Sequence, residues 1–199
     1  MKQLVVILAL CATSLLATFL VVQSQQQSSV AEIIEARRSV RAYEPKKVER
    51  EKLEQILEAG RVAPTGANRQ PQRLVVIESE EGMARLARCT RDFGAPLAIL
   101  VCADTTEVWT RKYDGKQIAD IDATIITDHM MLQAASLGLD TLWICMFKPE
   151  VVREEFSLPE HLVPVNILLV GYGDGEPASP ERHAETRKPI TETVWYEHF

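Results

Sequence analysis

The chain has 199 residues, of which 46% are hydrophobic and 25% are charged, a composition ordinary for one globular domain with a sizeable core. Its 28 acidic residues outnumber its 22 basic residues, and the net charge of −6 excludes a broad cationic surface for nucleic acid. A local cluster of cations would therefore indicate a small binding site.

The N-terminal segment differs from the rest of the chain. Residues 4–22 carry no charge, and a polar stretch at residues 23–29 follows them. The apolar run is long enough to cross a bilayer, while its short basic start and the small residues Val22 and Ser24 suit a cleaved signal. We expect residues 1–29 to be a signal peptide or membrane anchor with a polar linker, and the protein to be membrane-anchored or exported. Lys2 alone does not decide which side of the membrane the domain faces.

From residue 30 onward, helical and strand patterns follow one another. Helical patterns cover residues 49–62, 80–89, 120–137 and 149–156, and apolar strand patterns cover residues 73–78, 96–103, 139–147 and 164–172. The helix at 80–89 is expected to turn Met83, Leu86 and Ala87 inward. The helix at 120–137 is apolar nearly all round and must be buried on several sides. Residues 105–116 are polar and predict a short lid or crossing loop.

The segment Arg37-Arg38-Ser39-Val40-Arg41 is the densest group of cations near the start of the domain. Arginine suits phosphate because its planar fork donates two parallel hydrogen bonds and stays charged at any working pH. By itself, the segment allows two interpretations: an anion-binding site, or a solvated cationic helix end.

Several other kinds of site lack support in the sequence. No Gly-x-Gly-x-x-Gly follows a strand, and neither Gly-x-x-x-x-Gly-Lys nor Gly-x-Ser-x-Gly occurs, so dinucleotide, P-loop and nucleophile-elbow sites are unsupported. Cys89, Cys102 and Cys145 form no CxxC pair and the histidines have no ligand spacing, so no metal site is expected. Cys102 and Cys145 lie in apolar strand patterns and are expected in the core.

Three motifs occur in a characteristic order: Arg37-Arg38-Ser39-Val40-Arg41, then Pro64-Thr65-Gly66-Ala67-Asn68-Arg69-Gln70-Pro71, then Arg187-Lys188-Pro189. With the long helix and the Trp143-Ile144 strand between them, the domain at residues 30–199 resembles the nitroreductase family of FMN-dependent oxidoreductases. The resemblance implies an α+β fold, a three-layer α/β/α sandwich with a central, mostly antiparallel sheet. It also implies a long buried core helix and a C-terminal tail, here with Trp195 and Tyr196, that wraps around a partner subunit.

The resemblance further implies a homodimer with FMN at the interface. Arg37, Arg38 and Ser39 would hold the phosphate and ribityl chain, and Arg187, with Lys188 beside it in the cofactor-binding set, would return to the same phosphate. Arg41 would lie near the N1 and O2 edge of the flavin, where negative charge accumulates on reduction.

The ring would be contacted from two directions. Asn68 and Gln70 would reach its polar edge, and the Pro64-Thr65-Gly66 turn would pack on it from the partner subunit. The strand at Trp143-Ile144 would pass the reactive N5. Gln72 stands where the family often has an aromatic residue, and the segment before the long helix is too short for the extra helices that cover the substrate in larger members.

The implied activity is transfer of a hydride from NADH or NADPH to FMN, followed by reduction of a nitroaromatic, quinone or similar conjugated acceptor in a ping-pong mechanism. Because the chemistry belongs to the flavin, no catalytic side chain is expected. Two alternatives stay open. One is a reductive dehalogenase of the iodotyrosine deiodinase type, although the spacing of Glu107, Tyr113 and Lys116 does not match its lid. The other is a non-catalytic, exported flavin-binding protein.

Overall fold

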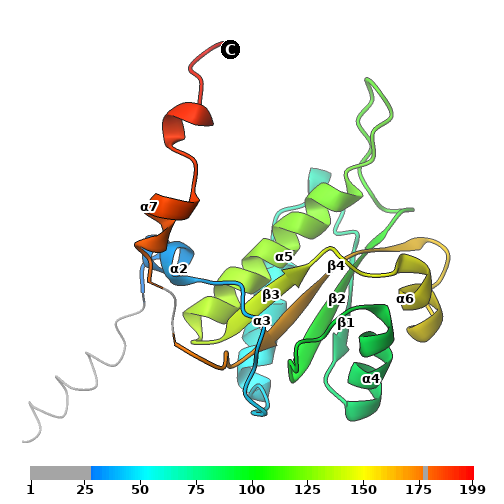
Figure 1. Ribbon diagram of the computed structural model, residues 1–199. Coiled ribbons are helices and arrows are strands. Elements are labelled where there is room, and N and C mark those ends of the chain that lie inside the picture. The colour runs from blue at the N-terminus through cyan, green and yellow to red at the C-terminus, as the bar shows by residue number, and fades with distance from the viewer. Residues whose placement is uncertain (1–27, 177–178) are drawn as a thin grey trace, which may run out of the picture.

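A four-stranded antiparallel sheet lies at the centre of the structure, a computed structural model that describes residues 28–176 and 179–199 (Figure 1). The strands are β1 (Gln72–Ile77), β2 (Leu97–Asp104), β3 (Asp140–Ile144) and β4 (Leu162–Gly171), in the spatial order β1-β2-β4-β3. Each of the four apolar patterns in the sequence corresponds to one strand. β3 ends at Ile144, however, earlier than the predicted limit at residue 147.

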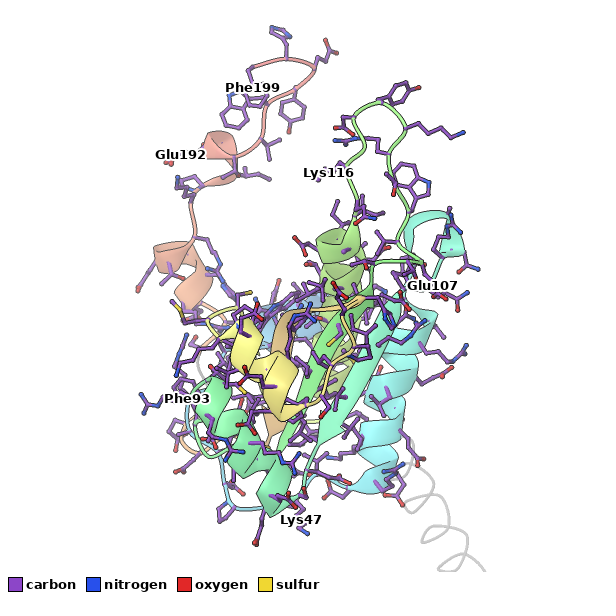
Figure 2. All side chains as sticks on the ribbon, turned by 90° about the vertical axis from the view of Figure 1, so that its right-hand side faces the viewer. Lys47, Phe93, Glu107, Lys116, Glu192 and Phe199 are labelled. Atoms are coloured by element: carbon purple, nitrogen blue, oxygen red, sulfur yellow. The ribbon has the colours of Figure 1, made fainter. Side chains whose placement is uncertain are left out.

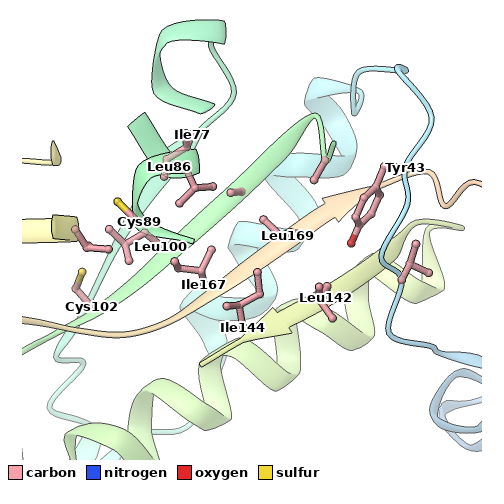
Figure 3. Packing of buried hydrophobic residues seen from close by; sticks show 14 residues of the cluster. Tyr43, Ile77, Leu86, Cys89, Leu100, Cys102, Leu142, Ile144, Ile167 and Leu169 are labelled. Atoms are coloured by element: carbon pink, nitrogen blue, oxygen red, sulfur yellow. The ribbon is translucent and has the colours of Figure 1, made fainter. Parts of the chain in front are cut away.

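The two central strands are buried on both faces of the sheet. Because successive side chains of a strand point to opposite faces, each of these strands contributes to two core clusters. One cluster takes Leu97, Ile99, Val101, Leu168 and Val170, and the other takes Ala98, Leu100, Cys102, Ile167 and Leu169 (Figure 3). A strand covered on both sides needs an unbroken apolar run, which is why these segments lack the alternation of a half-exposed strand.

Helices cover both faces and complete a three-layer α/β/α sandwich, as predicted. α3 (Arg50–Val62) and α5 (Ala119–Ser136) lie on one face, and α4 (Glu80–Cys89) and α6 (Pro149–Glu155) lie on the other (Figure 1). Leu53, Ile56 and Ile126 fill the first helical layer, and Leu86 and Val152 fill the second. Two short helices, α2 (Val30–Ala36) and α7 (Arg182–Thr186), and two 3-10 turns, η1 (Gly66–Asn68) and η2 (Ile190–Glu192), complete the described elements.

The long helix α5 is packed tightly against α3. A Cβ atom placed on Gly60 of α3 would lie 2.9 Å from Cγ of Met130, which is fully buried, so the close approach of the two helices requires a glycine there. Gly138 ends α5 with a φ of +72°, a conformation that glycine adopts without steric cost. The chain can therefore turn directly into β3.

The segment after α2 runs along the free edge of β3 and carries the arginine cluster to the sheet. The amide of Val40 donates to the carbonyl of Thr141 at 3.0 Å, and the amide of Asp174 donates to the carbonyl of Ala42 at 2.9 Å. Val40 is buried, whereas Ser39 and Arg41 on either side of it are exposed. This alternation leaves the polar side chains of the cluster on the outside.

Two segments project from the body of the molecule (Figure 2). We call residues 105–118 the arm: it leaves the end of β2, is closed by a bridge between Thr110 and Gln117, and returns to α5. The second is the C-terminal tail, in which Tyr196 is 84% exposed and Phe199 is 97% exposed. Within the described chain the tail packs on no core cluster, so its docking on a partner stays a prediction.

Two side chains lie differently from their predicted positions. Ala87 of α4 is exposed, because the buried stripe of this helix runs through Leu86 and Cys89, three residues apart. Cys145 is exposed and not in the core, because β3 ends one residue before it. Cys102 is buried as predicted, and burial raises the pKa of its thiol to about 11.

The predicted membrane-anchored or exported localisation is contradicted and is corrected here. Within residues 28–176 and 179–199, no helix has both the length and the apolarity needed to cross a bilayer. The longest of these helices, α5, has 18 residues but carries Asp120, Asp122 and Asp128. The proposed signal or anchor at residues 4–22 lies outside the described residues.

Candidate functional site

The arginine cluster lies in a pocket of about 580 Å³, which we call the arginine pocket. It is lined from both ends of the chain by Arg37, Arg38, Ser39, Val40, Arg41, Ala42, Asp174, Arg182 and Arg187. The lining contains five arginines and one carboxylate, that of Asp174. The arrangement suits a phosphate or another compact anion, because guanidinium groups bind such oxygens with paired, charge-assisted hydrogen bonds.

Helix α7 brings Arg187 to this pocket. Nη2 of Arg182 donates to the carbonyl of Arg37 at 2.8 Å, and the ring Nε2 of His183 lies 3.0 Å from the carbonyl oxygen of Glu35. These contacts hold α7 beside the end of α2, so Arg187, which directly follows α7, joins a cluster about 150 positions earlier in the chain. The sequence indicated Arg187 only through the family resemblance and gave no signal for Arg182.

Arg38 is committed to a neighbour within the protein. Its Nε donates to Oδ1 of Asp140 at 2.9 Å and its Nη2 donates to Oδ2 at 3.0 Å, and the guanidinium also donates to the carbonyl of Glu176. The hydrogen bond to Asp140 raises the pKa of Arg38 above its usual value. A Cβ atom on Gly173 would lie 2.4 Å from Oδ2 of Asp140, so this pair also needs the glycine beside it. Arg38 therefore fixes the wall of the pocket.

The other three predicted arginines are differently placed. Within residues 28–176 and 179–199, no ion pair involves Arg37, Arg41 or Arg187. Their charges are therefore not compensated by a carboxylate of the described chain. Cations grouped in this way repel one another, and an anion bound between them would relieve the repulsion.

A second pocket, of about 500 Å³, begins where β3 ends, and we call it the β3-end pocket. Its lining consists of Arg41, Cys89, Thr90, Arg91, Phe93, Leu142, Trp143, Ile144, Cys145, Met146, Phe147 and Lys148. Two predicted site residues, Trp143 and Ile144, are in this wall. Arg41 lines both pockets, so the cationic and the largely apolar site adjoin at this side chain.

The predicted turn at residues 64–70 lines neither pocket, and neither does Lys188. The turn lies at the start of α5, where the amide of Gly66 donates to Oδ1 of Asp122 at 2.9 Å. The arginine pocket lies beyond the other end of the same helix, beside Asp140. Since α5 has 18 residues, the two groups are separated by a helix about 27 Å long.

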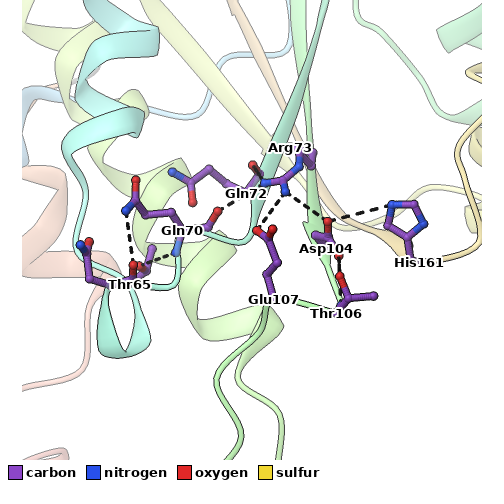
Figure 4. A network of polar contacts seen from close by, with 9 residues as sticks. Thr65, Gln70, Gln72, Arg73, Asp104, Thr106, Glu107 and His161 are labelled. Atoms are coloured by element: carbon purple, nitrogen blue, oxygen red, sulfur yellow. Dashed lines mark hydrogen bonds and ion pairs between the residues drawn. The ribbon is translucent and has the colours of Figure 1, made fainter.

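The backbone of this turn is unusual. Ala67, Asn68 and Gln70 have φ values of 50°, 55° and 53°, in the left-handed region that side chains other than glycine and asparagine rarely adopt. The conformation is held by Oγ1 of Thr65, which accepts from the amide of Gln70 at 3.0 Å (Figure 4). The three left-handed residues are all exposed. The hydrogen bond from Gln70 to Thr65 therefore fixes a backbone whose left-handed residues expose their side chains.

A polar network joins the turn to the base of the arm (Figure 4). Nη2 of Arg73 donates to Oδ2 of Asp104 at 3.1 Å and to Oε2 of Glu107 at 2.9 Å, while its Nη1 donates to the carbonyl of Gln70 at 3.3 Å. Hydrogen bonds from Thr106 lower the pKa of the Asp104 carboxyl. Glu107 is thus paired with Arg73, whereas Tyr113 is 98% exposed, and these lid candidates do not gather in one site.

Comparisons with known proteins agree on one family. A model described as the nitroreductase family matches residues 34–94 and 86–172. A relative from Methanothermobacter thermautotrophicus, provisionally named NADH dehydrogenase/NAD(P)H nitroreductase, is 30% identical over 159 residues, which cover 75% of this chain and 80% of the relative.

Solved structures lead to the same family. The crystal structure of a nitroreductase family protein from Clostridium difficile 630 is 55% identical, with a TM-score of 0.84, over 86% of this chain and 99% of that one. A nitroreductase-type protein from Exiguobacterium sibiricum, crystallised in complex with FMN, is 26% identical, with a TM-score of 0.71, over 87% of this chain and 99% of that one.

Proposed function

Because this chain belongs to the nitroreductase family, we propose that it is an FMN-dependent oxidoreductase that takes a hydride from NAD(P)H and reduces a nitroaromatic, quinone or similar conjugated acceptor. One observation carries the proposal most directly. Arginines from the two ends of the chain meet in a single pocket, and Arg41 joins that pocket to a second one walled by Trp143 and Ile144. FMN has a phosphate at one end and a flat ring at the other.

The residues of the arginine pocket fit the phosphate end of FMN. Arg37 and Arg187 supply guanidinium forks that make no ion pair within the described residues, and the exposed Ser39 adds a short hydroxyl donor to the same lining. Arg38 holds the wall through Asp140 and serves the cofactor by keeping this segment in place. Lys188 lies in an exposed position next to Arg187 and adds to the local positive field.

The β3-end pocket fits the ring. Arg41 would stabilise the negative charge that develops on the reduced ring, and the strand end at Trp143-Ile144 would form a wall beside the ring. When bound, FMN would supply the redox chemistry, which is hydride transfer from NAD(P)H and reduction of the second substrate in a ping-pong sequence. The chain contributes binding, orientation and charge, and no side chain is assigned as catalytic.

The site is completed by a second copy of the chain. The turn with Pro64, Thr65, Gly66, Asn68 and Gln70 is separated from the arginine pocket of its own chain by the length of α5, so it reaches FMN only in a homodimer. The exposed Trp195 and Tyr196 of the tail would then pack on the partner subunit. This separation supports a homodimer with FMN at the interface.

The first experiment tests flavin binding and reduction. The purified chain is reconstituted with FMN, and its absorbance is followed during anaerobic addition of NADH or NADPH and then of an acceptor. Binding with bleaching by either nucleotide supports the proposal; bound FMN that neither nucleotide reduces would instead identify a non-catalytic flavin-binding protein. Replacing Arg37 and Arg187 together with Ala should weaken FMN binding by about 100-fold or more, because each loses charge-assisted hydrogen bonds to phosphate.

Arg50→Ala is the matched control, because Arg50 pairs with the exposed Glu54 of α3 and lines neither pocket. It should bind FMN as the parent chain does. If the double variant at Arg37 and Arg187 retains FMN with unchanged affinity, the assignment of the arginine pocket is wrong.

The homodimer is tested by mixing two defective chains. One carries the double substitution at Arg37 and Arg187, and the other carries Gly66→Ala in the turn. If each site takes arginines from one copy and the turn from the other, random exchange of subunits restores about a quarter of the sites. No recovery of FMN binding after exchange would show that one chain builds the whole site.

A further inference from the structure

The β3-end pocket has more positive charge than the proposed cofactor needs. Arg41, Arg91 and Lys148 all line it, and its lining contains no carboxylate. Its remaining walls are largely aromatic or aliphatic, with Phe93, Trp143 and Phe147 among them. In a chain with a net charge of −6, three cations around one apolar pocket require an explanation.

Arg91 and Lys148 are held at this pocket by contacts that leave their charges uncompensated. The guanidinium carbon of Arg91 lies 4.6 Å from the ring centroid of Phe93, and Nζ of Lys148 lies 3.5 Å from the carbonyl oxygen of Arg88. No ion pair in the described ranges, 28–176 and 179–199, involves either side chain. The proposed function assigns the phosphate to the arginine pocket and the reduced ring to Arg41, and it gives no role to Arg91 or Lys148.

We propose that Arg91 and Lys148 select an acceptor that carries a carboxylate or sulfonate on its conjugated ring. The acceptor ring would lie beside the flavin ring in the β3-end pocket, against Phe93 and Phe147, and its anionic substituent would point to the two cations. This inference rests on the proposed function and narrows its substrate class from conjugated acceptors in general to anionic ones. Cation and aromatic wall together recognise such a molecule better than either alone.

The anionic group takes no part in the redox step. For a quinone acceptor, NAD(P)H loses a hydride and the quinone gains two electrons and two protons, one from the hydride and one from solvent, to give the hydroquinone. The carboxylate or sulfonate is unchanged, and its contribution is to binding and orientation. Its signature is therefore a difference between charged and uncharged acceptors of similar reactivity.

The experiment uses the FMN-loaded protein and two matched acceptors, 4-nitrobenzoate and 4-nitrobenzamide. The parent chain should have the higher kcat/KM for the anion. In a double variant with Arg91→Gln and Lys148→Gln, the ratio of the two kcat/KM values should fall by about tenfold, since each exposed charge changes binding by a few-fold. Arg91→Lys with Lys148→Arg, which keeps both charges, should restore most of the preference.

Lys47→Gln is the matched control, because Lys47 is exposed and lines neither pocket. Raising the salt concentration from about 0.05 M to about 0.5 M should also narrow the preference of the parent chain, because exposed charges are screened. A binding readout free of turnover uses benzoate and benzamide, whose dissociation constants are followed by the flavin absorbance. The double variant should bind benzoate more weakly than the parent chain does, while its affinity for benzamide should be unchanged.

Three results would overturn the inference. The first is an equal ratio of kcat/KM values in the parent chain and the double variant. The second is a selective rise in KM for NADPH relative to NADH with the acceptor ratio unchanged, which would assign the cations to a nucleotide phosphate. The third is a parent chain that neither binds FMN nor is reduced; that outcome is visible before any acceptor is added, and it removes the proposed function as well.

Discussion

Gly66→Ala is the sharpest test of how the turn at residues 64–70 is held. A Cβ atom at this position would lie 2.4 Å from Cδ1 of Ile118 and 3.0 Å from Cβ of Trp109, both at the base of the arm. Ile118 can rotate in part, but Cβ of Trp109 moves only with its backbone. The turn must therefore shift away from the arm, and this overpacking costs about 1–3 kcal/mol.

The shift also strains a partly buried hydrogen bond. Gly66 donates its amide to Oδ1 of Asp122, a residue that is 1% exposed and whose Oδ2 has no partner within the described residues. Weakening this bond to a carboxylate adds about 1.5–3 kcal/mol. Because the two effects relieve one another as the turn moves, we expect a total loss of about 2–4 kcal/mol in the free energy of unfolding.

The assay is urea unfolding of the FMN-free chain, followed by titration with FMN. Gly66→Ala should lower the unfolding midpoint and, if the turn completes the FMN site of a partner subunit as proposed, it should also weaken FMN binding. Ala67→Gly is the matched control, because the exposed Ala67 has a φ of 50°. Glycine relieves about 1 kcal/mol of left-handed strain, which offsets the entropy that its more flexible backbone loses on folding, so the midpoint should stay close to that of the parent chain. A Gly66→Ala chain with the parent's midpoint and FMN affinity would refute this reasoning.

Two further predictions concern stability. Gly60→Ala should lower the free energy of unfolding by about 1 kcal/mol, because overpacking against Met130 at 2.9 Å outweighs a gain of about 1 kcal/mol in helix propensity. If urea unfolding shows a stabilised variant, the Met130 side chain moves aside without cost and the prediction is wrong. The pKa of Asp104 is lowered in the folded chain, first by the Thr106 hydroxyl and also by His161 and Arg73. The ionised Asp104 therefore adds to the free energy of unfolding at neutral pH, and this stabilisation disappears as the pH falls below about 4. Thr106→Val should therefore lower the urea midpoint more at pH 7 than at pH 3, and an equal loss at both values would contradict this origin of the shift.

The sheet and its helices could be predicted from the sequence because local patterns determine them. The apolar runs that became β2 and β4 can be buried only between two helical layers, and the nearly uniform apolar surface of α5 requires the same. Gly138 marks the end of α5 for a local steric reason. The inward position predicted for Ala87 failed because a small residue carries little information about which face of a helix is buried.

Long-range pairing could not be predicted in this way. Arg37, Arg38 and Arg41 look alike in the sequence, yet among the described residues only Arg38 of these three forms an ion pair, 102 positions away with Asp140. The left-handed conformation of Ala67 is also invisible, since alanine normally avoids it. Arg91 and Lys148 cannot be singled out from the sequence, because one follows α4 and the other precedes α6 and each resembles an ordinary cation at a helix end. Only the fold brings them to one pocket.

The position of the turn argues that the site is divided between two copies of the chain. Strained left-handed residues persist only where the surrounding structure over-determines them. Here the amide of Gly66 is anchored on buried Asp122, and Arg73 anchors the carbonyl of Gln70, yet the side chains that this scaffold fixes are exposed. This turn lies at the opposite end of α5 from the arginine pocket of its own chain. We infer that it is preorganised for the cofactor of the partner subunit, whose pocket supplies the arginines.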